Sequence, residues 1–357
     1  MRVQRVALQG VTPDELVRLV PGVALDEARR VVSQVHRDEA PSTPHSGIRR
    51  GSREAVVAAG HVPALAVVAE QASKIDPFVK YALRTADDHV VETVRIPLEK
   101  PGRFSVCVSS QVGCALACAF CATGRLGLLR NLETWEIVEQ VRIVRRGIAN
   151  GRVHGVVFQG MGEPMANLDR VLAAIAVLNE PSAQAIDARG ITVCTSGLPT
   201  GIRRLAREAP KVRLGLSIGS ALLDVRRRLM PIERSHTLPD VMEAVIEHAT
   251  LTGLAPMWAV TLLRDVNDDP AHAAALADLV ARFRDRTGSS PRLSIIPYNA
   301  IGDDDPFART QDDREEAYRD ALRERGVFTH KRYSGGGDVA AACGQLAARP
   351  SLDTQRI

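Results

Sequence analysis

Residues 106–124 read VCVSSQVGCALACAFCATG and contain four of the six cysteines in this chain of 357 residues. Within this stretch, Cys114, Cys118 and Cys121 have the spacing C-x-x-x-C-x-x-C. They fall in a loop directly after a predicted strand, residues 103–110. Three thiolates can bind three irons of a 4Fe–4S cluster and leave the fourth iron open. The stretch therefore predicts an iron–sulfur site at the end of a strand.

The open iron of such a cluster can chelate the amino and carboxylate groups of S-adenosylmethionine. Electron transfer into the sulfonium then splits a carbon–sulfur bond and gives a 5′-deoxyadenosyl radical, so the spacing is typical of a radical enzyme. Two other interpretations compete with this one. Structural zinc normally needs four ligands, and no fourth Cys or His follows at a suitable spacing. Three unrelated buried thiols are the remaining alternative.

Outward from this stretch, apolar β-branched runs alternate with helical segments. The predicted strands are residues 103–110, 154–160, 191–197, 212–219, 255–263 and 292–299, and the predicted helices are residues 133–147, 168–179, 199–208, 238–251, 270–286 and 311–325. Repeated strand–helix units of this length imply parallel strands with right-handed crossovers. We predict an α/β fold, a partial (β/α)6 barrel, with a doubly wound sheet as the alternative. Active sites of β/α barrels lie at the carboxyl ends of the strands, where the cysteine loop falls.

Residues 1–75 are predicted to form a small helical domain. Thr12 is a suitable N-cap, with Pro13 at the first helical position and Glu15 at capping-box distance. A Pro-Gly break separates the two helical patterns and suggests a helix-hairpin-helix, which would hold a nucleic-acid backbone. A plain helical cap on the larger domain is the alternative.

The rest of the chain divides into a barrel domain, residues 76–346, and a C-terminus, residues 347–357, that we expect to be disordered. The barrel domain begins with a strand at residues 90–97, which we expect to pair with the cysteine-bearing strand. A glycine-rich tail, SGGGDVAAACGQL, ends this domain. Residues 37–52 are expected to form a mobile loop.

The net charge of +4 says little about partners, but three basic clusters stand out. Each is most simply a solvated helix face, and each could also meet RNA phosphates. The clusters are Arg49, Arg50 and Arg53; Arg142, Arg145 and Arg146; and Arg226 to Arg228. The chain has no apolar run of about 18 residues and its N-terminus lacks a signal-peptide pattern. We therefore expect a cytoplasmic protein that does not enter a membrane.

Several motifs together resemble the radical S-adenosylmethionine RNA adenine methyltransferases of the RlmN/Cfr type. They are the cysteine stretch at 106–124, GMGEP at 160–164, DVAAACGQL at 338–346, VETVRIP upstream and IIPYN downstream. The C-x-x-x-C-x-x-C spacing marks only the superfamily. A cysteine seven residues before it, Cys107, and another in the tail, Cys343, mark this family.

The resemblance implies a reaction that uses two S-adenosylmethionine molecules per turnover. One methylates Cys343, and the other is cleaved at the cluster to give the radical that activates this methyl group. The carbon then adds to adenine in RNA (rRNA, tRNA or both), and Cys107 forms a transient disulfide with Cys343 to release the product. Glu92 matches the family's base. Carbon 2 of adenine is the expected target, a flavodoxin- or ferredoxin-type protein the expected reductant, and a monomer the expected state.

The resemblance also implies the residues that contact S-adenosylmethionine: Gly162, Glu163, Ser217 and Asn299, with Cys194 and Gly219 at two further family positions. The family usually has Ser where this chain has Cys194 and His where it has Gly219. These departures suggest a divergent paralogue. Aromatic residues make up only 4% of the chain, so few rings can stack a base, and the candidates are Trp258, Tyr298 and Phe307.

Two other functions are compatible with the sequence. A radical enzyme of this kind could attack carbon 8 of adenine or a substrate other than RNA. A non-catalytic iron–sulfur or zinc protein could bind RNA, although Cys107 and Cys343 would then have no use.

Overall fold

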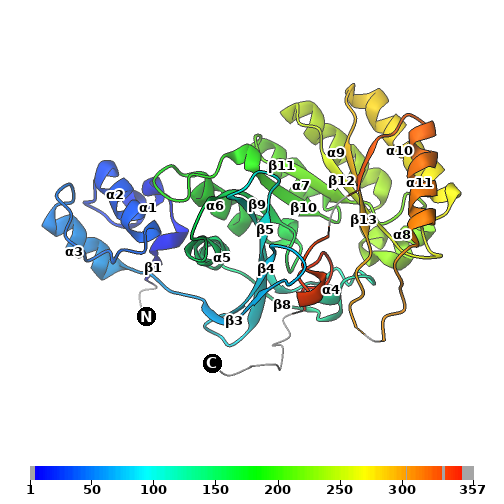
Figure 1. Cartoon of the computed structure of the whole chain (residues 1–357). Coiled ribbons are helices and arrows are strands. Elements are labelled where there is room, and N and C mark those ends of the chain that lie inside the picture. The colour runs from blue at the N-terminus through cyan, green and yellow to red at the C-terminus, as the bar shows by residue number, and fades with distance from the viewer. Residues whose placement is uncertain (1–4, 303, 332–333, 348–357) are drawn as a thin grey trace.

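The computed structural model describes residues 5–302, 304–331 and 334–347. Its centre is one ten-stranded sheet with the order β14-β13-β12-β11-β10-β9-β6-β5-β4-β3. From β6 to β14 every neighbouring pair of strands is parallel. From β3 to β6 the pairs are antiparallel. The sheet therefore joins a parallel part to an antiparallel meander at β6 (Figure 1).

The strands of this sheet are β3 (Ala66–Ala72), β4 (Val79–Arg84), β5 (Val90–Pro97), β6 (Arg103–Val108), β9 (Arg152–Phe158), β10 (Ile191–Thr195), β11 (Arg213–Ser217), β12 (Met257–Leu262), β13 (Arg292–Pro297) and β14 (Thr329–Lys331). The helices that accompany it are α4 (Ala122–Arg125), α5 (Thr134–Arg146), α6 (Leu168–Asn179), α7 (Pro199–Glu208), α8 (Leu223–Leu229), α9 (Leu238–Thr252), α10 (Pro270–Thr287) and α11 (Asp312–Glu324). A small antiparallel hairpin, β7 (Gln111–Gly113) with β8 (Leu128–Asn131), brackets the cysteine loop. Short 3-10 helices are η2 (Pro164–Asn167), η3 (Ala188–Gly190), η4 (Pro231–Arg234) and η5 (Gly337–Val339).

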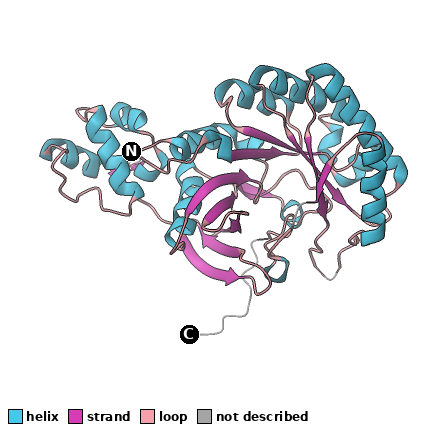
Figure 2. Ribbon diagram, turned by 45° about the horizontal axis from the view of Figure 1, so that its top comes forward, coloured by secondary structure: helices cyan, strands magenta, loops and turns pink. Residues whose placement is uncertain are grey.

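The parallel strands are buried on both faces, which explains why they read as continuous apolar runs. Crossover helices cover the outer side of the curved sheet in Figure 2. In the core, Trp258 of β12 packs edge-to-face on Phe283 of α10, with ring centroids 5.3 Å apart. The strand order has two ends, so the barrel is open. The predicted α/β fold with a partial barrel is confirmed, and β14 adds a short seventh parallel strand to the six expected.

The N-terminal part is helical, with α1 (Pro13–Leu19), α2 (Leu25–His36), α3 (Arg50–Ala59), the 3-10 turn η1 (Leu8–Gly10) and a two-stranded ladder of β1 (Val6–Ala7) and β2 (Gly60–His61). The predicted capping box is confirmed, because Thr12 Oγ1 accepts from Glu15 N and Glu15 Oε2 accepts from Thr12 N at 2.8 Å. These helices have their own apolar core. They lie to one side of the sheet in Figure 1.

The expectation of helix throughout residues 1–75 is wrong for residues 66–72. This segment, AVVAEQA, forms strand β3 at the edge of the sheet and pairs with β4. Alanine, glutamate and glutamine favour helices, but pairing with β4 outweighs that preference here. The mobile loop expected at 37–52 ends earlier than predicted, because α3 already begins at residue 50. Of the C-terminus expected to be disordered, all but residue 347 lies outside the described residues.

No helix in the described part of the chain is long and apolar enough to cross a membrane. The parallel strands have two ends, which we call the carboxyl-terminal edge and the amino-terminal edge of the parallel part. The cysteine loop and the GMGEP turn lie at their carboxyl ends, whereas the loops that lead into the strands lie at their amino ends.

Candidate active site

The cysteine loop begins after β7 and ends at β8, the two strands of the small hairpin. Gly113, just before Cys114, has φ +76°, and a Cβ there would lie 1.8 Å from Gly127 O, so only glycine fits. Cys114 N donates to Gly127 O at 2.8 Å, and Ala119 N donates to Leu229 O at 2.9 Å. The loop is therefore fixed at both ends by backbone hydrogen bonds.

The three motif thiols lie in a dry environment. Burial raises the pKa of Cys114 to about 11 and that of Cys118 to about 12, and it also raises the pKa of Cys121. The negative charge of Cys121 also contributes to raising the pKa of the other two thiols, so the three groups lie within electrostatic reach of one another. Thiolates in such a place need a nearby positive charge, which iron would supply.

The arrangement fits an iron–sulfur cluster better than zinc. In the described part of the chain, no group of three or more His, Cys, Asp or Glu side chains could hold one metal ion. A cluster avoids this requirement because each thiolate binds a different iron. Cys118 and Cys121 line a cavity of about 140 Å³ that offers space on their open side.

The GMGEP turn forms one wall of this cavity. Glu163 is 3% exposed, its Oε1 accepts from Met165 N at 3.0 Å, and its Oε2 accepts from Ser196 N at 2.9 Å. Burial raises the pKa of this carboxyl group and the backbone donors oppose the shift. Gly162 has φ +99° and packs against Gln111, where a Cβ would lie 2.6 Å from the side chain. The turn thus presents a buried acceptor for an ammonium group.

Ser217, Cys194 and Gly219 line the same cavity from the ends of neighbouring strands. Gly219 has φ +69°, and a Cβ there would lie 2.4 Å from Met230 Sδ. A side chain at this position would therefore require the Met230 thioether to move. Cys194 is 7% exposed, and its Sγ packs over Gly215.

The sequence did not reveal the role of Arg226. Its side chain is fully buried, and its Nε donates to Glu233 Oε2 at 2.7 Å. Its Nη2 donates to Ser196 O at 2.8 Å, and its Nη1 donates to Ser217 O at 3.2 Å. The expectation of a solvated face is wrong for this residue. Arg226 precedes Leu229 and Met230 by one helical turn, and this spacing is the signal that places it on the apolar face.

The tail brings Cys343 to the cavity that the cysteine loop lines. Gly344 O accepts from Ala122 N at 2.8 Å, directly after the last cysteine of the motif. Asn299 Nδ2 donates to Ser334 Oγ at 2.8 Å and to Cys343 O at 3.4 Å. Asn299 therefore holds the tail in this structure, while its expected contact with the cofactor stays a prediction.

Cys343 and Cys107 both line a second cavity, of about 70 Å³. Gln159, at the end of β9, and Cys343 line both this cavity and the larger one. Cys107 comes from β6 and is 9% exposed. None of the six cysteines, which all lie in the described part of the chain, forms a disulfide. Two cysteines separated by more than 200 residues therefore line the same cavity, and their pairing stays a prediction.

Glu92 is buried beside the tail rather than in the walls of either cavity. Its Oε1 pairs with Lys80 Nζ at 3.2 Å, and its Oε2 accepts from Ala347 N at 2.8 Å. Among the three rings expected to stack a base, Trp258 is fully buried in the core, so that expectation is wrong for it. Tyr298 lines the larger cavity and lies edge-to-face on Phe307.

Comparison with known proteins gives a consistent result. Residues 108–269 match the family model of the radical SAM superfamily. A protein of Sorangium cellulosum named "Probable RNA methyltransferase" is 57% identical over 96% of this chain and 92% of its own length. The dual-specificity RNA methyltransferase RlmN of Syntrophobacter fumaroxidans is 42% identical over 75% of this chain and 76% of its own. A crystal structure of a radical SAM methyltransferase from Sphaerobacter thermophilus aligns with TM-score 0.86 and 33% identity, over 96% of this chain and all of that one.

Proposed function

Because the chain belongs to the radical SAM RNA methyltransferases of the RlmN type, we propose that it methylates carbon 2 of an adenine in rRNA, tRNA or both. One observation carries this proposal: Cys343 lines the cavity beside Cys118 and Cys121 and also the cavity beside Cys107. A thiol in this position can receive a methyl group on one side and be resolved by a second thiol on the other.

The family uses a 4Fe–4S cluster and S-adenosylmethionine, and we propose Cys114, Cys118 and Cys121 as the ligands of the cluster. When bound, this pair supplies the adenosyl radical that removes hydrogen from a methyl group. Glu163 offers carboxylate oxygens to the ammonium group of S-adenosylmethionine. Two further positions on this cavity, Ser217 and Gly219, offer a hydroxyl and backbone groups.

Cys343 accepts a methyl group on Sγ, and its thiol proton leaves. Carbon 2 of adenine is electrophilic, so direct transfer from a sulfonium fails, whereas a carbon radical held on sulfur can add to it. The adduct would then return its unpaired electron to the cluster and lose the proton of carbon 2 to a base. Cys107 attacks Cys343 Sγ as a thiolate, so an S–S bond forms while the S–C bond breaks and the product carbon takes up a proton to become the methyl group. A dithiol reductant must reduce the disulfide before the next turnover. This scheme uses two S-adenosylmethionine molecules per turnover: one as the source of the methyl group on Cys343 and one as the source of the radical.

We assign proton removal from the adenine adduct to Glu92, which Lys80 pairs at 3.2 Å. In the docked tail, Ala347 N occupies its Oε2. Movement of the tail would break this backbone contact, so the position of the tail and the surroundings of the base are coupled. We further propose a flavodoxin- or ferredoxin-type reductant, a monomeric enzyme, and action in the cytoplasm, where rRNA and tRNA lie.

The test compares Cys343→Ala with Cys107→Ala, each purified anaerobically with its cluster. We expect Cys343→Ala to lose methylation completely while visible absorption and iron content stay unchanged. Cys107→Ala should also stop turnover, but with RNA covalently attached to Cys343, because the resolving thiol is absent. Mass spectrometry of the nucleosides distinguishes carbon 2 from carbon 8. Methylated RNA from Cys343→Ala would show the mechanism to be wrong.

A further inference from the structure

The amino-terminal edge of the parallel strands carries two hollows that share Arg145. One, of about 260 Å³, lies where β9 begins, and Arg152 and Gln184 are among its walls. The other, of about 310 Å³, lies where α2 ends, and Arg37, Arg142 and Arg146 are among its walls. We call these two hollows together the basic site, defined by Arg37, Arg142, Arg145, Arg146 and Arg152.

Positive charge is in excess at the basic site. Asp38 and Glu139 pair with Arg142 and Arg146 at distances between 2.5 and 3.1 Å. In the described part of the chain, Arg37, Arg145 and Arg152 have no carboxylate partner, although most arginines of the barrel helices have one.

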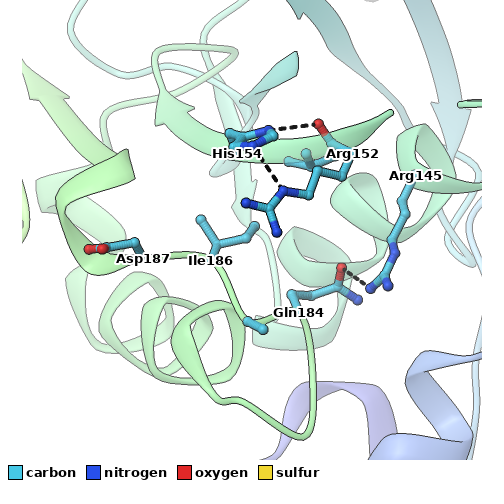
Figure 3. A pocket seen from close by; sticks show the side chains of 8 residues that line it. Arg145, Arg152, His154, Gln184, Ile186 and Asp187 are labelled. Carbon is cyan, nitrogen blue, oxygen red and sulfur yellow. Dashed lines mark hydrogen bonds between the residues drawn. The ribbon is translucent and has the colours of Figure 1, made fainter. Parts of the chain in front are cut away.

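The side chains of the first hollow are arranged around open space. Arg145 Nη1 donates to Gln184 Oε1 at 3.2 Å, and Arg152 Nε donates to His154 Nε2 at 2.8 Å. These contacts fix the two guanidinium groups and leave their other N–H groups for a ligand. Figure 3 shows both groups beside the same hollow, with the carboxylate of Asp187 pointing away from them.

The second hollow contains buried donors without a partner. His36 is 4% exposed, and its Nδ1 accepts from Gln184 Nε2 at 2.8 Å. Burial and the charges of Arg142 and Arg145 lower the pKa of His36 to about 3, so its single proton lies on Nε2. Neither His36 Nε2 nor Arg142 Nε, also buried, has a hydrogen-bond partner among the described residues. Unsatisfied buried donors are costly, and these two lie on residues that line the second hollow, beside its excess of positive charge.

We propose that the basic site binds a stretch of the phosphodiester backbone of the RNA substrate, away from the adenine that reacts, with Arg145 as the contact common to both hollows. This rests on the proposed function in RNA methylation. Guanidinium groups bind phosphate oxygens in a bidentate manner. Two adjacent anion sites joined by one arginine suit neighbouring phosphates of one strand.

The distance from the reaction favours RNA over a smaller ligand or a protein reductant. Seven residues of β9 separate Arg152 from the cavity at the other edge, which is about 20 Å at about 3.3 Å per residue. A structured RNA spans that distance easily, whereas a small anion at the basic site could not take part in the reaction. An acidic reductant would need to dock near the cluster to pass an electron.

The experiment measures binding of bulk tRNA, prepared from cells lacking the gene, to the holoenzyme at several salt concentrations. The test variant is Arg145→Gln with Arg152→Gln. The matched control is Arg203→Gln with Arg286→Gln, which removes the same charge from exposed arginines that pair with Glu247 and Glu243. We expect the test variant to bind at least about tenfold more weakly and to lower the slope of log K against log salt by roughly 1.5. The control should change affinity less than twofold.

The outcomes separate this proposal from the proposed function. Cleavage of S-adenosylmethionine without RNA should be equal in all three proteins. Wild-type affinity and salt slope in the test variant, together with normal RNA methylation, would overturn the basic site alone. Unchanged RNA affinity with slower reduction by flavodoxin would assign the surface to a protein partner and overturn it as well. A wild-type enzyme that neither binds nor methylates RNA would overturn both proposals.

Discussion

The two edges of the parallel sheet use arginine in opposite ways. At the carboxyl-terminal edge, Arg226 is fully buried and pairs with Glu233 while it donates to the carbonyls that end two strands. At the amino-terminal edge, Arg145 and Arg152 are exposed, and no carboxylate among the described residues pairs with them. The first arginine organises a dry pocket, and the other two leave their charge available to a ligand.

This difference follows from what each edge must do. The radical chemistry of this family needs an enclosed space from which water is excluded, so a cation there must be paired with protein acceptors. Phosphate recognition works at a wet surface, where unpaired arginines attract a polyanion over a long range. The two edges therefore differ in whether their arginines have carboxylate partners, and not in how many arginines they have.

The prediction with the largest expected effect tests whether Arg226 organises the carboxyl-terminal edge. Replacement of Arg226 by Met leaves Glu233 buried without its partner, so we expect the free energy of unfolding to fall by about 3–5 kcal/mol. Arg227→Met is the control, because Arg227 is half exposed and pairs, among the described residues, only with Asp224 at 3.3 Å. Its effect should stay below about 0.5 kcal/mol. Denaturant unfolding of both variants gives the answer. Equal stability of the two would show that the buried ion pair does not organise this edge.

A second, smaller effect measures how tightly the catalytic edge is packed. Gly219 and Gly253 have nearly the same backbone conformation, φ +69° and φ +68°, but only Gly219 faces a neighbour, Met230 Sδ. Replacement of Gly253 by Ala should cost about 1 kcal/mol, the backbone strain alone. Gly219→Ala should cost about 2–3 kcal/mol, because overpacking against the thioether adds to that strain.

Met230 is fully buried, so Met230→Ala is destabilising by itself. In a double-mutant cycle, Gly219→Ala should cost less in the Met230→Ala background than in the wild type, and the difference is the packing contribution. Denaturant unfolding of the single and double variants measures both contributions. If Gly219→Ala and Gly253→Ala cost the same, the Met230 thioether does not oppose a side chain at the position of Gly219.

The parallel part of the fold was predictable from sequence because its strands are buried on both faces and read as unbroken apolar runs. The run that forms β3 was not predictable in this way. It lies at an edge, is half exposed and contains residues with helical preference, so only its pairing with β4 makes it a strand. The capping box at Thr12 could be predicted because its hydrogen bonds are local.

The candidate site divides along similar lines. The spacing of Cys114, Cys118 and Cys121 is local, and the convergence of Cys107 with Cys343 came from the family resemblance. Neither route could separate the cluster at 142–146 from the cluster at 226–228, because both read as basic faces of helices. The environment of Arg226 depends on Glu233 and on carbonyls at the ends of strands. The environment of the cluster at 142–146 depends on α2 and on the loop before β10. These partners are brought near only by folding.

The smallest effect tests the electric field of the basic site through His36. Its pKa is about 3 in the folded protein, lowered first by burial and then by Arg142 and Arg145, while Asp38 opposes the shift. The unfolded chain, with a pKa near 6.5, binds the extra proton between these values. His36 therefore contributes stability that is complete above about pH 6.5 and is lost as the pH falls toward 3. Between pH 7 and pH 5 the loss should be about 2 kcal/mol.

His248 gives the matched comparison, because burial alone lowers its pKa to about 4. Added salt screens the charge of Arg145, which is exposed, more than the charge of Arg142, which is buried, and it changes burial little. Salt should therefore reduce the part of the pH dependence that His36→Gln removes, and leave the part that His248→Gln removes. Denaturant unfolding at pH 5 and pH 7, in low and high salt, measures both contributions. Equal salt responses would mean that the arginines of the basic site exert no net field on His36, and the contrast between the two edges would lose its electrostatic basis.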